Sequence, residues 1–182
     1  MNELARKNEN EILLDDLREA YMEIFPTADI EKQLAILEPN SYVAVTCSPT
    51  KGVEETLDMT ERLLDQGFRV APHIAARCVR NRQHLSGIVA RLSAMNIESI
   101  FVPGGDRPEP LGEYHTAFQL LRDISDFDHG IKEIGIAAHP EGHPDVDDDV
   151  LIQELEKKQA YAQYIVTQMC FDAERLGNWL ID

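Results

Sequence analysis

The stretch "EIGIAAHPEGHPDVDDDVLIQELEKK", from Glu133 to Lys158, contains one complete strand, loop and helix. An apolar run over residues 133–138 is followed by a polar loop with two prolines, after which Leu151 and Leu155 recur at helical spacing. Short apolar runs that alternate with amphipathic helices indicate βαβ units built around a parallel sheet. The stretch therefore predicts an α/β fold.

The same alternation recurs along the whole chain. Strands are predicted over residues 20–25, 41–47, 69–74, 99–104, 133–138 and 164–170, and apolar residues at helical spacing lie between them. Units of about thirty residues are typical of a (β/α)8 TIM barrel. Because only six units are present, we expect an incomplete or open barrel, whose edges a partner subunit or the N-terminal helix covers.

Length and composition favour one soluble domain. The chain has 182 residues, of which 43% are hydrophobic, so we expect one domain over residues 1–182 that begins with a helix over residues 1–18. The sequence contains neither a long apolar run nor a secretory signal, which predicts a cytoplasmic protein. A net charge of −16 disfavours nucleic acid and anionic membranes as partners. We expect a small-molecule substrate and a homo-oligomer.

The three cysteines are Cys47, Cys78 and Cys170. Their wide spacing and odd number favour reduced thiols over a disulfide framework or a zinc ribbon. Cys47 and Cys170 fall at the ends of apolar runs, where small buried side chains are expected.

A polar residue stands where each predicted strand ends. In parallel β/α barrels the active site forms at the carboxyl ends of the strands, so these residues are predicted to line one rim. The alternative is that polar residues end strands only because loops begin there. The six residues are Glu23, Thr46, His73, Asp106, His139 and Gln168.

Two of these residues are carboxylates with a possible catalytic role. Glu23 stands between apolar neighbours, and if it faces the barrel interior, burial favours its protonated form and lets it donate a proton near neutral pH. An outward-facing Glu23 would simply be solvated. Asp106 follows Gly104 and Gly105, which let the main chain approach a ligand closely, although a tight turn explains these glycines equally well.

Histidines raise two further possibilities. His73 by itself is more often a hydrogen-bonded structural residue than a ligand or a base. The spacing of His139, Glu141 and His143 could suit a metal ion, but two prolines stiffen this loop and no helix face presents the ligands. We therefore predict no metal site, and we expect the acidic residues at 147–149 to begin the next helix.

Six short motifs, taken together, resemble the methylenetetrahydrofolate reductase family. They are "EIFP", "VAVTCSP", "APHIAARC", "GGD", "IAAHPEGHPD" and "IVTQMCFD", and they occur in family order between residues 21 and 172. The resemblance implies a (β/α)8 barrel that binds FAD along the strand ends. In this family NAD(P)H, as co-substrate, reduces the flavin, which then reduces 5,10-methylenetetrahydrofolate to 5-methyltetrahydrofolate.

The resemblance also implies a role for individual residues. Glu23 matches the proton donor that helps to open the imidazolidine ring, Asp106 matches a carboxylate near the flavin and the pterin, and Gln168 matches a substrate-binding glutamine. Catalysis would then involve Glu23 and Asp106, and substrate binding would involve Asp106 and Gln168. The residues expected to contact the cofactor are Thr46, Cys47, His73, Gly104, Gly105, Asp106, His139, His143 and Lys157.

Three positions depart from the flavin-binding members of the family. Gly104 stands where these members have an arginine, His139 where they have an aromatic residue, and Cys47 where they have a tyrosine. Two alternatives therefore stay open. The chain could be a flavin-free relative that transfers hydride directly or acts in another one-carbon or demethylation step, or a truncated relative that binds a reduced folate as a non-catalytic subunit.

Overall fold

The computed structural model describes residues 17, 20–27 and 30–181. All six predicted strands are confirmed, although most are shorter than expected. The helix expected over residues 1–18 lies, apart from Leu17, outside the described residues. The strands are β1 (Met22–Ile24), β2 (Tyr42–Val45), β3 (Arg69–Pro72), β4 (Ser99–Val102), β5 (Glu133–Ala138) and β6 (Tyr164–Thr167).

A helix follows each strand, so the chain forms six βα units. The capping of α5 shows how local sequence sets a boundary, because Thr116 and Gln119 form a reciprocal capping box at its N-terminus. In the described part of the chain no helix is long and apolar enough to cross a membrane. The helices are α2 (Ile30–Leu34), α3 (Gly52–Asp65), α4 (Arg82–Ala94), α5 (Ala117–Ile124), α6 (Asp148–Lys158) and α7 (Ala173–Trp179), with 3-10 turns η1 (Ala76–Cys78) and η2 (Gln159–Tyr161).

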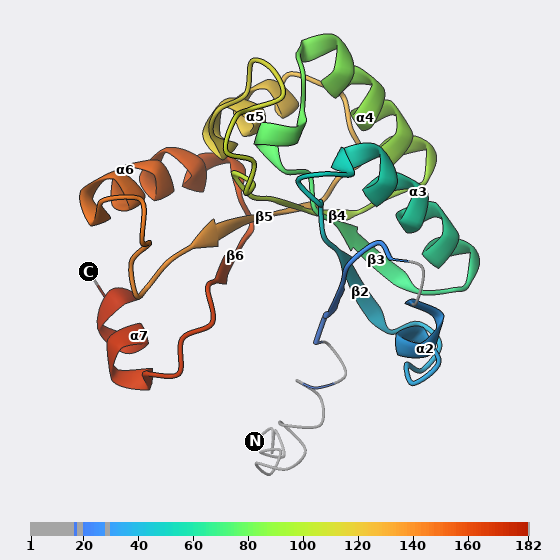
Figure 1. Ribbon diagram of the computed structural model, residues 1–182, viewed down its shortest axis with the longest axis horizontal. Coiled ribbons are helices and arrows are strands. Elements are labelled where there is room, and N and C mark those ends of the chain that lie inside the picture. The colour runs from blue at the N-terminus through green and yellow to red at the C-terminus, as the bar shows by residue number, and fades with distance from the viewer. Residues whose placement is uncertain (1–16, 18–19, 28–29, 182) are drawn as a thin grey trace, which may run out of the picture.

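All strand pairs are parallel. The order β1-β2-β3 forms one sheet and β4-β5-β6 forms a second. A parallel bridge between His73 and Phe101 connects the two sheets, so the strands follow one another in chain order along an arch (Figure 1). Six βα units on a curved parallel sheet are consistent with a partial TIM-barrel-like fold, and within the described residues β1 and β6 are the edges.

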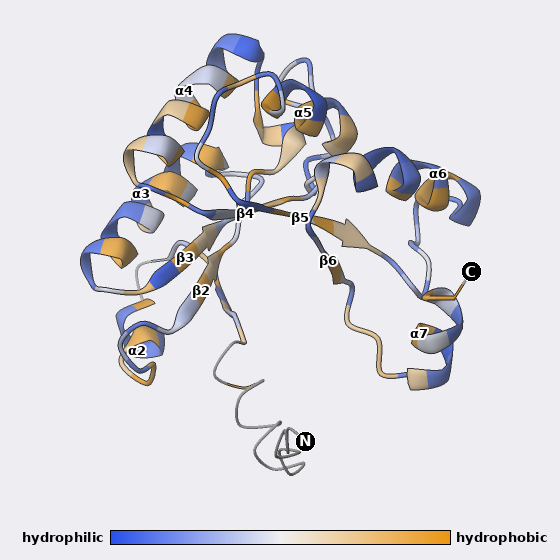
Figure 2. Cartoon of the chain, turned by 180° about the vertical axis from the view of Figure 1, so that it is seen from behind, coloured by the Kyte–Doolittle hydropathy of each residue, from blue (hydrophilic) through white to orange (hydrophobic). Residues whose placement is uncertain are grey.

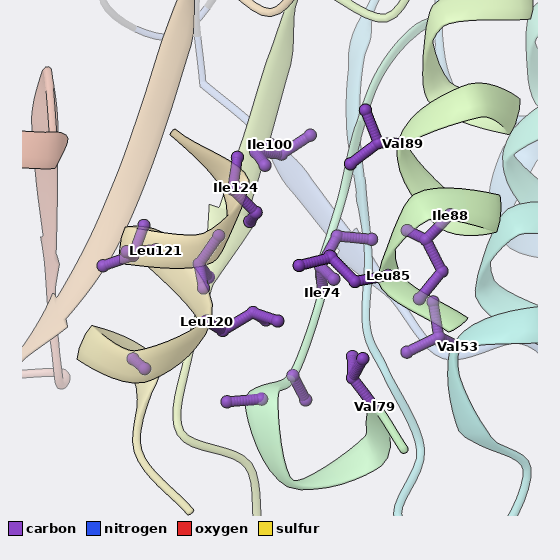
Figure 3. Close-up of a cluster of buried hydrophobic side chains, with 14 of the residues drawn as sticks. Val53, Ile74, Val79, Leu85, Ile88, Val89, Ile100, Leu120, Leu121 and Ile124 are labelled. Carbon is purple, nitrogen blue, oxygen red and sulfur yellow. The ribbon is translucent and has the colours of Figure 1, made fainter. Parts of the chain in front are cut away.

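The hydrophobic core lies between the outer face of the arch and its helices. Helices α3, α4 and α5 cover this outer face, with their apolar sides toward the strands (Figure 2). Leu85, Leu120 and Ile100 are fully buried where α4, α5 and β4 meet (Figure 3). A second cluster joins α2 and α3 to β1, β2 and β3. Helix α6 differs, because it has no fully buried residue.

The inner face of the arch carries the alternate residues of each strand. Because Val43 and Val45 point into the core, Ala44 faces the other way, and the strand register places Glu23 beside it. On β5 the inner face is made by Gly135 and Ala137, since Ile134 and Ile136 belong to the core. Small side chains, Ala44 and Ala71, therefore lie beside Glu23 on the inner face, whereas the Tyr164 ring covers Gly135 on β5.

Candidate functional site

Four of the six predicted polar residues, Thr46, His73, His139 and Gln168, directly follow a strand at its carboxyl end, whereas Glu23 lies within β1 and Asp106 lies in the loop beyond β4. Main-chain hydrogen bonds continue three of the four parallel ladders by one step, from Thr46 N to Ile24 O (2.9 Å), from His73 N to Val45 O (2.9 Å) and from Gln168 N to Ala138 O (2.8 Å). These bonds hold the first residue after β2, β3 and β6 in register with the neighbouring strand. The edge is therefore a continuous carboxyl-end rim, the usual place for ligands on parallel sheets.

Thr46 and Cys47 occupy the rim after β2. The Thr46 side chain is buried, and its hydroxyl donates to Ile24 O at 3.1 Å. The single hydroxyl proton is used in this bond, which links β2 to β1. The Thr46 oxygen can therefore only accept a hydrogen bond from a ligand. Cys47 is partly buried rather than fully buried, so the expectation of a buried small side chain is wrong here.

His73 lies at the junction of the two sheets. Its imidazole packs edge-on against Phe101, with 4.7 Å between ring centroids. Burial lowers the pKa of His73 to about 4, because the charged imidazolium loses its hydration there. The side chain is therefore neutral at pH 7, which suits contact with an uncharged ring better than contact with a phosphate.

The lowered pKa of His73 predicts a pH-dependent stability. Its ordinary unfolded value is about 6.5, so below that pH the unfolded chain binds a proton that the folded chain does not, and the free energy of unfolding falls as pH falls toward 4. When the pH is lowered from 7 to 5.5, we expect the free energy of unfolding of wild type to fall by about 1.2 kcal/mol more than that of His73→Gln. Urea unfolding at the two pH values, both above the sequence pI of 4.7, measures this difference.

His115→Gln provides the matched control, because His115 is exposed. This variant should keep the pH dependence of wild type. Equal pH dependence in wild type and His73→Gln would show that His73 is not held neutral by the fold.

The loop between β4 and α5 carries Gly104, Gly105 and Asp106. Gly105 has φ +95, and a Cβ there would lie 2.9 Å from the Ala75 Cβ, so the close approach of the loop to the segment after β3 requires glycine. Asp106 is exposed at this turn and is free to meet a ligand. The predicted carboxylate therefore stands at the rim.

Two arginines that the sequence analysis did not single out hold this loop. Arg77 Nε donates to Arg107 O at 2.6 Å, and its Nη2 donates to Pro108 O. Arg107 Nη1 in turn donates to Pro49 O in the loop after β2. Both guanidinium groups thus bind carbonyl groups and keep their charge near the rim. The arginine directly after "GGD" is the sequence signal that could have indicated Arg107.

His139 and His143 lie together in the loop after β5. Their rings are edge-on, with centroids 5.3 Å apart. Burial lowers the pKa of His139, and the nearby His143 and Lys158 lower it further. Glu141 is exposed, and among the residues that the structure describes no group of three His, Cys, Asp or Glu side chains is placed to hold a metal ion. Asp147 precedes α6, where Asp148 and Asp149 form the first turn, as expected.

A cavity of about 180 Å³ lies between the end of β5, α6 and α7, beside His139. This volume is below the roughly 300–1,000 Å³ of typical small-molecule pockets, so it would hold part of a dinucleotide rather than the whole molecule. Lys158 and Arg175 both line it, and they donate to Ala137 O (3.1 Å) and Pro140 O (3.2 Å). Burial lowers the pKa of Lys158, because the charged ammonium group loses hydration. A bound anion would stabilise the charged form of this lysine.

One of the predicted cofactor residues does not face this cavity. Lys157 does not line it, and its Nζ instead pairs with Glu154 at 2.8 Å. Lys158 takes the inward position because successive helical residues point about 100° apart. The sequence showed two adjacent lysines but not which one faces inward.

Glu23 lies on the inner face of the arch and is exposed. The expectation that its apolar neighbours bury the carboxyl is wrong for this structure, because Ile24 points into the core and Phe25 is 63% exposed. Neighbours in sequence point away from one another on a strand, so they do not shield Glu23. Gln168 is likewise exposed at the end of β6.

Fold and rim together define an α/β protein of the parallel-sheet class, with a candidate ligand site along the carboxyl ends of its strands. The family model described as methylenetetrahydrofolate reductase matches residues 28–182. The chain therefore belongs to the methylenetetrahydrofolate reductase family, which makes it a folate-related oxidoreductase. Glu23 precedes the matched range, so its role is supported by the "EIFP" resemblance and by its place on the inner face.

Proposed function

We propose that the chain reduces 5,10-methylenetetrahydrofolate to 5-methyltetrahydrofolate in the cytoplasm, with electrons from NAD(P)H that pass through FAD. The observation that carries the proposal is the family match over residues 28–182, combined with the polar rim at the strand ends. A flat pterin and a flavin could stack over the small residues of the inner face. On β5 the Tyr164 ring lies over Gly135, so a stacked ring would use the inner face beside Ala44 and Glu23.

Glu23 and Asp106 are the proposed catalytic residues. Opening of the imidazolidine ring needs a proton on the leaving nitrogen, and Glu23 is a carboxyl on the inner face that could supply it. The iminium that forms is a cation, which the Asp106 carboxylate would stabilise at the rim. Gln168 has both a donor and an acceptor for the pterin.

The charges along the rim suit an anionic dinucleotide. In the described part of the chain, Arg77, Arg107, Lys158 and Arg175 donate to main-chain carbonyl groups and form no ion pair with a carboxylate. These four cations are thus not held in direct ion pairs, although Asp148 and Glu154 line the same cavity as Lys158 and Arg175 and the chain carries a net charge of −16. Charge-assisted hydrogen bonds to phosphate are among the stronger contacts in proteins, at about 1.5–3 kcal/mol each.

When bound, FAD would supply hydride transfer from the nicotinamide to the folate. Lys158 and Arg175 would hold an anionic part of the cofactor at the cavity beside β5. The neutral His73 would pack beside an uncharged part, and the glycines at 104 and 105 would allow the cofactor to approach the main chain.

Two measurements test the proposal: folate-dependent oxidation of NAD(P)H and the visible absorption spectrum of the purified protein. The purified chain should oxidise NADH or NADPH only when 5,10-methylenetetrahydrofolate is added, and its visible spectrum should show bound flavin. Formation of 5-methyltetrahydrofolate is followed by chromatography. Absence of folate-dependent oxidation, with flavin supplied in excess, would contradict the proposal.

The flavin-free relative is the second candidate, and a specific observation favours it. Gly104, His139 and Cys47 replace an arginine, an aromatic residue and a tyrosine of the flavin-binding pattern. A colourless preparation that still converts the folate with NAD(P)H would identify this alternative. The visible absorption spectrum of the purified protein therefore distinguishes the two candidates.

The Gly104→Arg variant should bind FAD about tenfold more tightly than wild type. A Cβ at Gly104 meets nothing within 4 Å, and its backbone is not in the left-handed region, so an arginine fits. One added charge-assisted contact to a phosphate contributes at least about 1.4 kcal/mol, which is a factor of ten in affinity. Titration of flavin fluorescence measures the change.

Gly130→Arg is the matched control, because it adds the same charge at another glycine with nothing within 4 Å. The control should leave FAD affinity within about twofold of wild type. An equal gain in both variants would mean that net charge, rather than a contact at the rim, limits flavin binding.

A further inference from the structure

The loop of residues 103–116, between β4 and α5, carries Asp106 but contains no helix or strand. A main-chain hydrogen bond from Arg77 N to Gly104 O (2.9 Å) ties its start to the η1 turn. Among the described residues, no side chain hydrogen-bonds or forms an ion pair with the Asp106 carboxylate. The position of this carboxylate therefore depends on how the main chain of the loop is held.

The Arg77 side chain holds the part of the loop that follows Asp106. Its Nε donates to Arg107 O at 2.6 Å, and its Nη2 donates to Pro108 O. Its Nη1 donates to His115 O at 3.5 Å, near the far end of the loop. One half-buried guanidinium group thus binds the loop both directly after Asp106 and at its far end.

The main chain of the loop is bound by Arg77 on its other side as well. Leu111 N donates to Arg77 O at 2.9 Å, so both the side chain and the carbonyl group of Arg77 contact the loop. Arg107, whose carbonyl group Arg77 binds, reaches across the rim with its own side chain and donates to Pro49 O. Because Arg107 directly follows Asp106, a shift of its main chain moves the Asp106 carboxylate with it.

We propose that Arg77 is a positioning residue for Asp106, and that it acts through the fixed directions of its N–H groups rather than through its charge. The guanidinium group is planar and its donors keep a constant geometry. A lysine has a single ammonium group, which cannot span the carbonyl groups of Arg107 and Pro108 in the same way. The role rests on the proposed function, because Asp106 is a catalytic residue only there.

Hydrogen exchange of the full chain, followed by mass spectrometry, tests the tether without any substrate. In Arg77→Lys, which keeps the charge, the amides of Leu111 and Glu113 should exchange about tenfold faster or more, because each lost hydrogen bond from a charged donor is worth at least about a factor of ten. The amides of α4 and β5 in the same sample should keep their wild-type rates, which would show that the fold is intact.

Arg91→Lys is the matched control, because Arg91 lies in the last turn of α4 and pairs with Asp58 at 2.8 Å, outside the loop. This variant makes the same change of side chain and should leave the loop amides at wild-type rates. Wild-type exchange of the loop in Arg77→Lys, or equal acceleration in both variants, would overturn the proposal.

Steady-state kinetics shows whether the tether acts through Asp106. Arg77→Lys should lower kcat for folate-dependent NAD(P)H oxidation by about tenfold or more, because a displacement of about 1 Å at a catalytic group can cost about 100-fold. In an Asp106→Asn background, Arg77→Lys should change kcat by less than about twofold, because no carboxylate is left to position. Equal effects in the two backgrounds would mean that Arg77 acts independently of Asp106 and would overturn its positioning role.

Failure of this proposal and failure of the proposed function are separate results. Absence of folate-dependent oxidation in wild type would contradict the proposed function, whereas the exchange rates still decide whether Arg77 holds the loop. Wild-type turnover together with unchanged loop exchange in Arg77→Lys would contradict only the role of Arg77.

Discussion

Glu23→Gln should lower kcat for folate-dependent NAD(P)H oxidation by about 100-fold or more. A general acid typically contributes 10²–10⁴-fold, and glutamine has the shape of glutamic acid but no proton to donate at neutral pH. The effect should fall on kcat, while the KM for the folate changes little, because the amide can still hydrogen-bond a bound ring. Steady-state kinetics with varied folate separates the two parameters.

Glu133→Gln is the control for this variant. Glu133 is an exposed carboxylate at the start of β5, far along the strand from the rim, and its substitution makes the same change of charge. Its kcat should stay within about twofold of wild type. An unchanged kcat in Glu23→Gln would remove the proposed proton donor and would favour a non-catalytic folate-binding subunit.

Gly112→Ala should destabilise the fold by about 3 kcal/mol. A Cβ at Gly112 would lie 1.8 Å from Arg80 O and 2.5 Å from Arg80 C, and main-chain atoms cannot swing aside as a side chain does. The contact is tight because the next residue, Glu113, donates its N–H to the same carbonyl at 2.8 Å. Overpacking costs about 1–3 kcal/mol, and loss of this hydrogen bond adds about 1 kcal/mol.

Urea unfolding measures this change, and Gly130→Ala is the control. A Cβ at Gly130 meets nothing within 4 Å, so this variant should stay within about 0.5 kcal/mol of wild type or gain slightly. Because the loop that contains Gly112 also carries Asp106, we expect folate affinity to fall with stability in Gly112→Ala. Equal stability of the two variants would show that this loop is not tightly packed.

The sequence predicted the fold because its signals are local. Apolar runs and helical spacing placed all six strands, and the polar residues directly after β2, β3, β5 and β6 predicted the rim. Parallel strands in chain order bring their carboxyl ends to one edge, so knowing the order of the elements was enough to place Thr46, His73 and Gln168 on the same edge. The helix start at Asp148 is equally local.

Side-chain environments depended on residues that are distant in sequence. The apolar neighbours of Glu23 suggested that its carboxyl is buried. Adjacent residues of a strand point to opposite faces of the sheet, so these neighbours do not cover Glu23, which is exposed. Of two adjacent lysines, the packing of α6 decided that Lys158 rather than Lys157 lines the cavity. The anchoring of Arg77 to Arg107 O spans thirty residues, a contact that no local pattern shows.

The sequence by itself thus determined the α/β class, the strand order, the rim and the family motifs. Only the tertiary structure decided which groups on that rim are buried, charged or paired, including the neutral state of His73 and the contact between Arg77 and the Arg107 carbonyl group. The physical reason is that periodicity and capping act within a few residues of the chain, whereas desolvation and hydrogen bonding depend on whichever atoms the fold brings near.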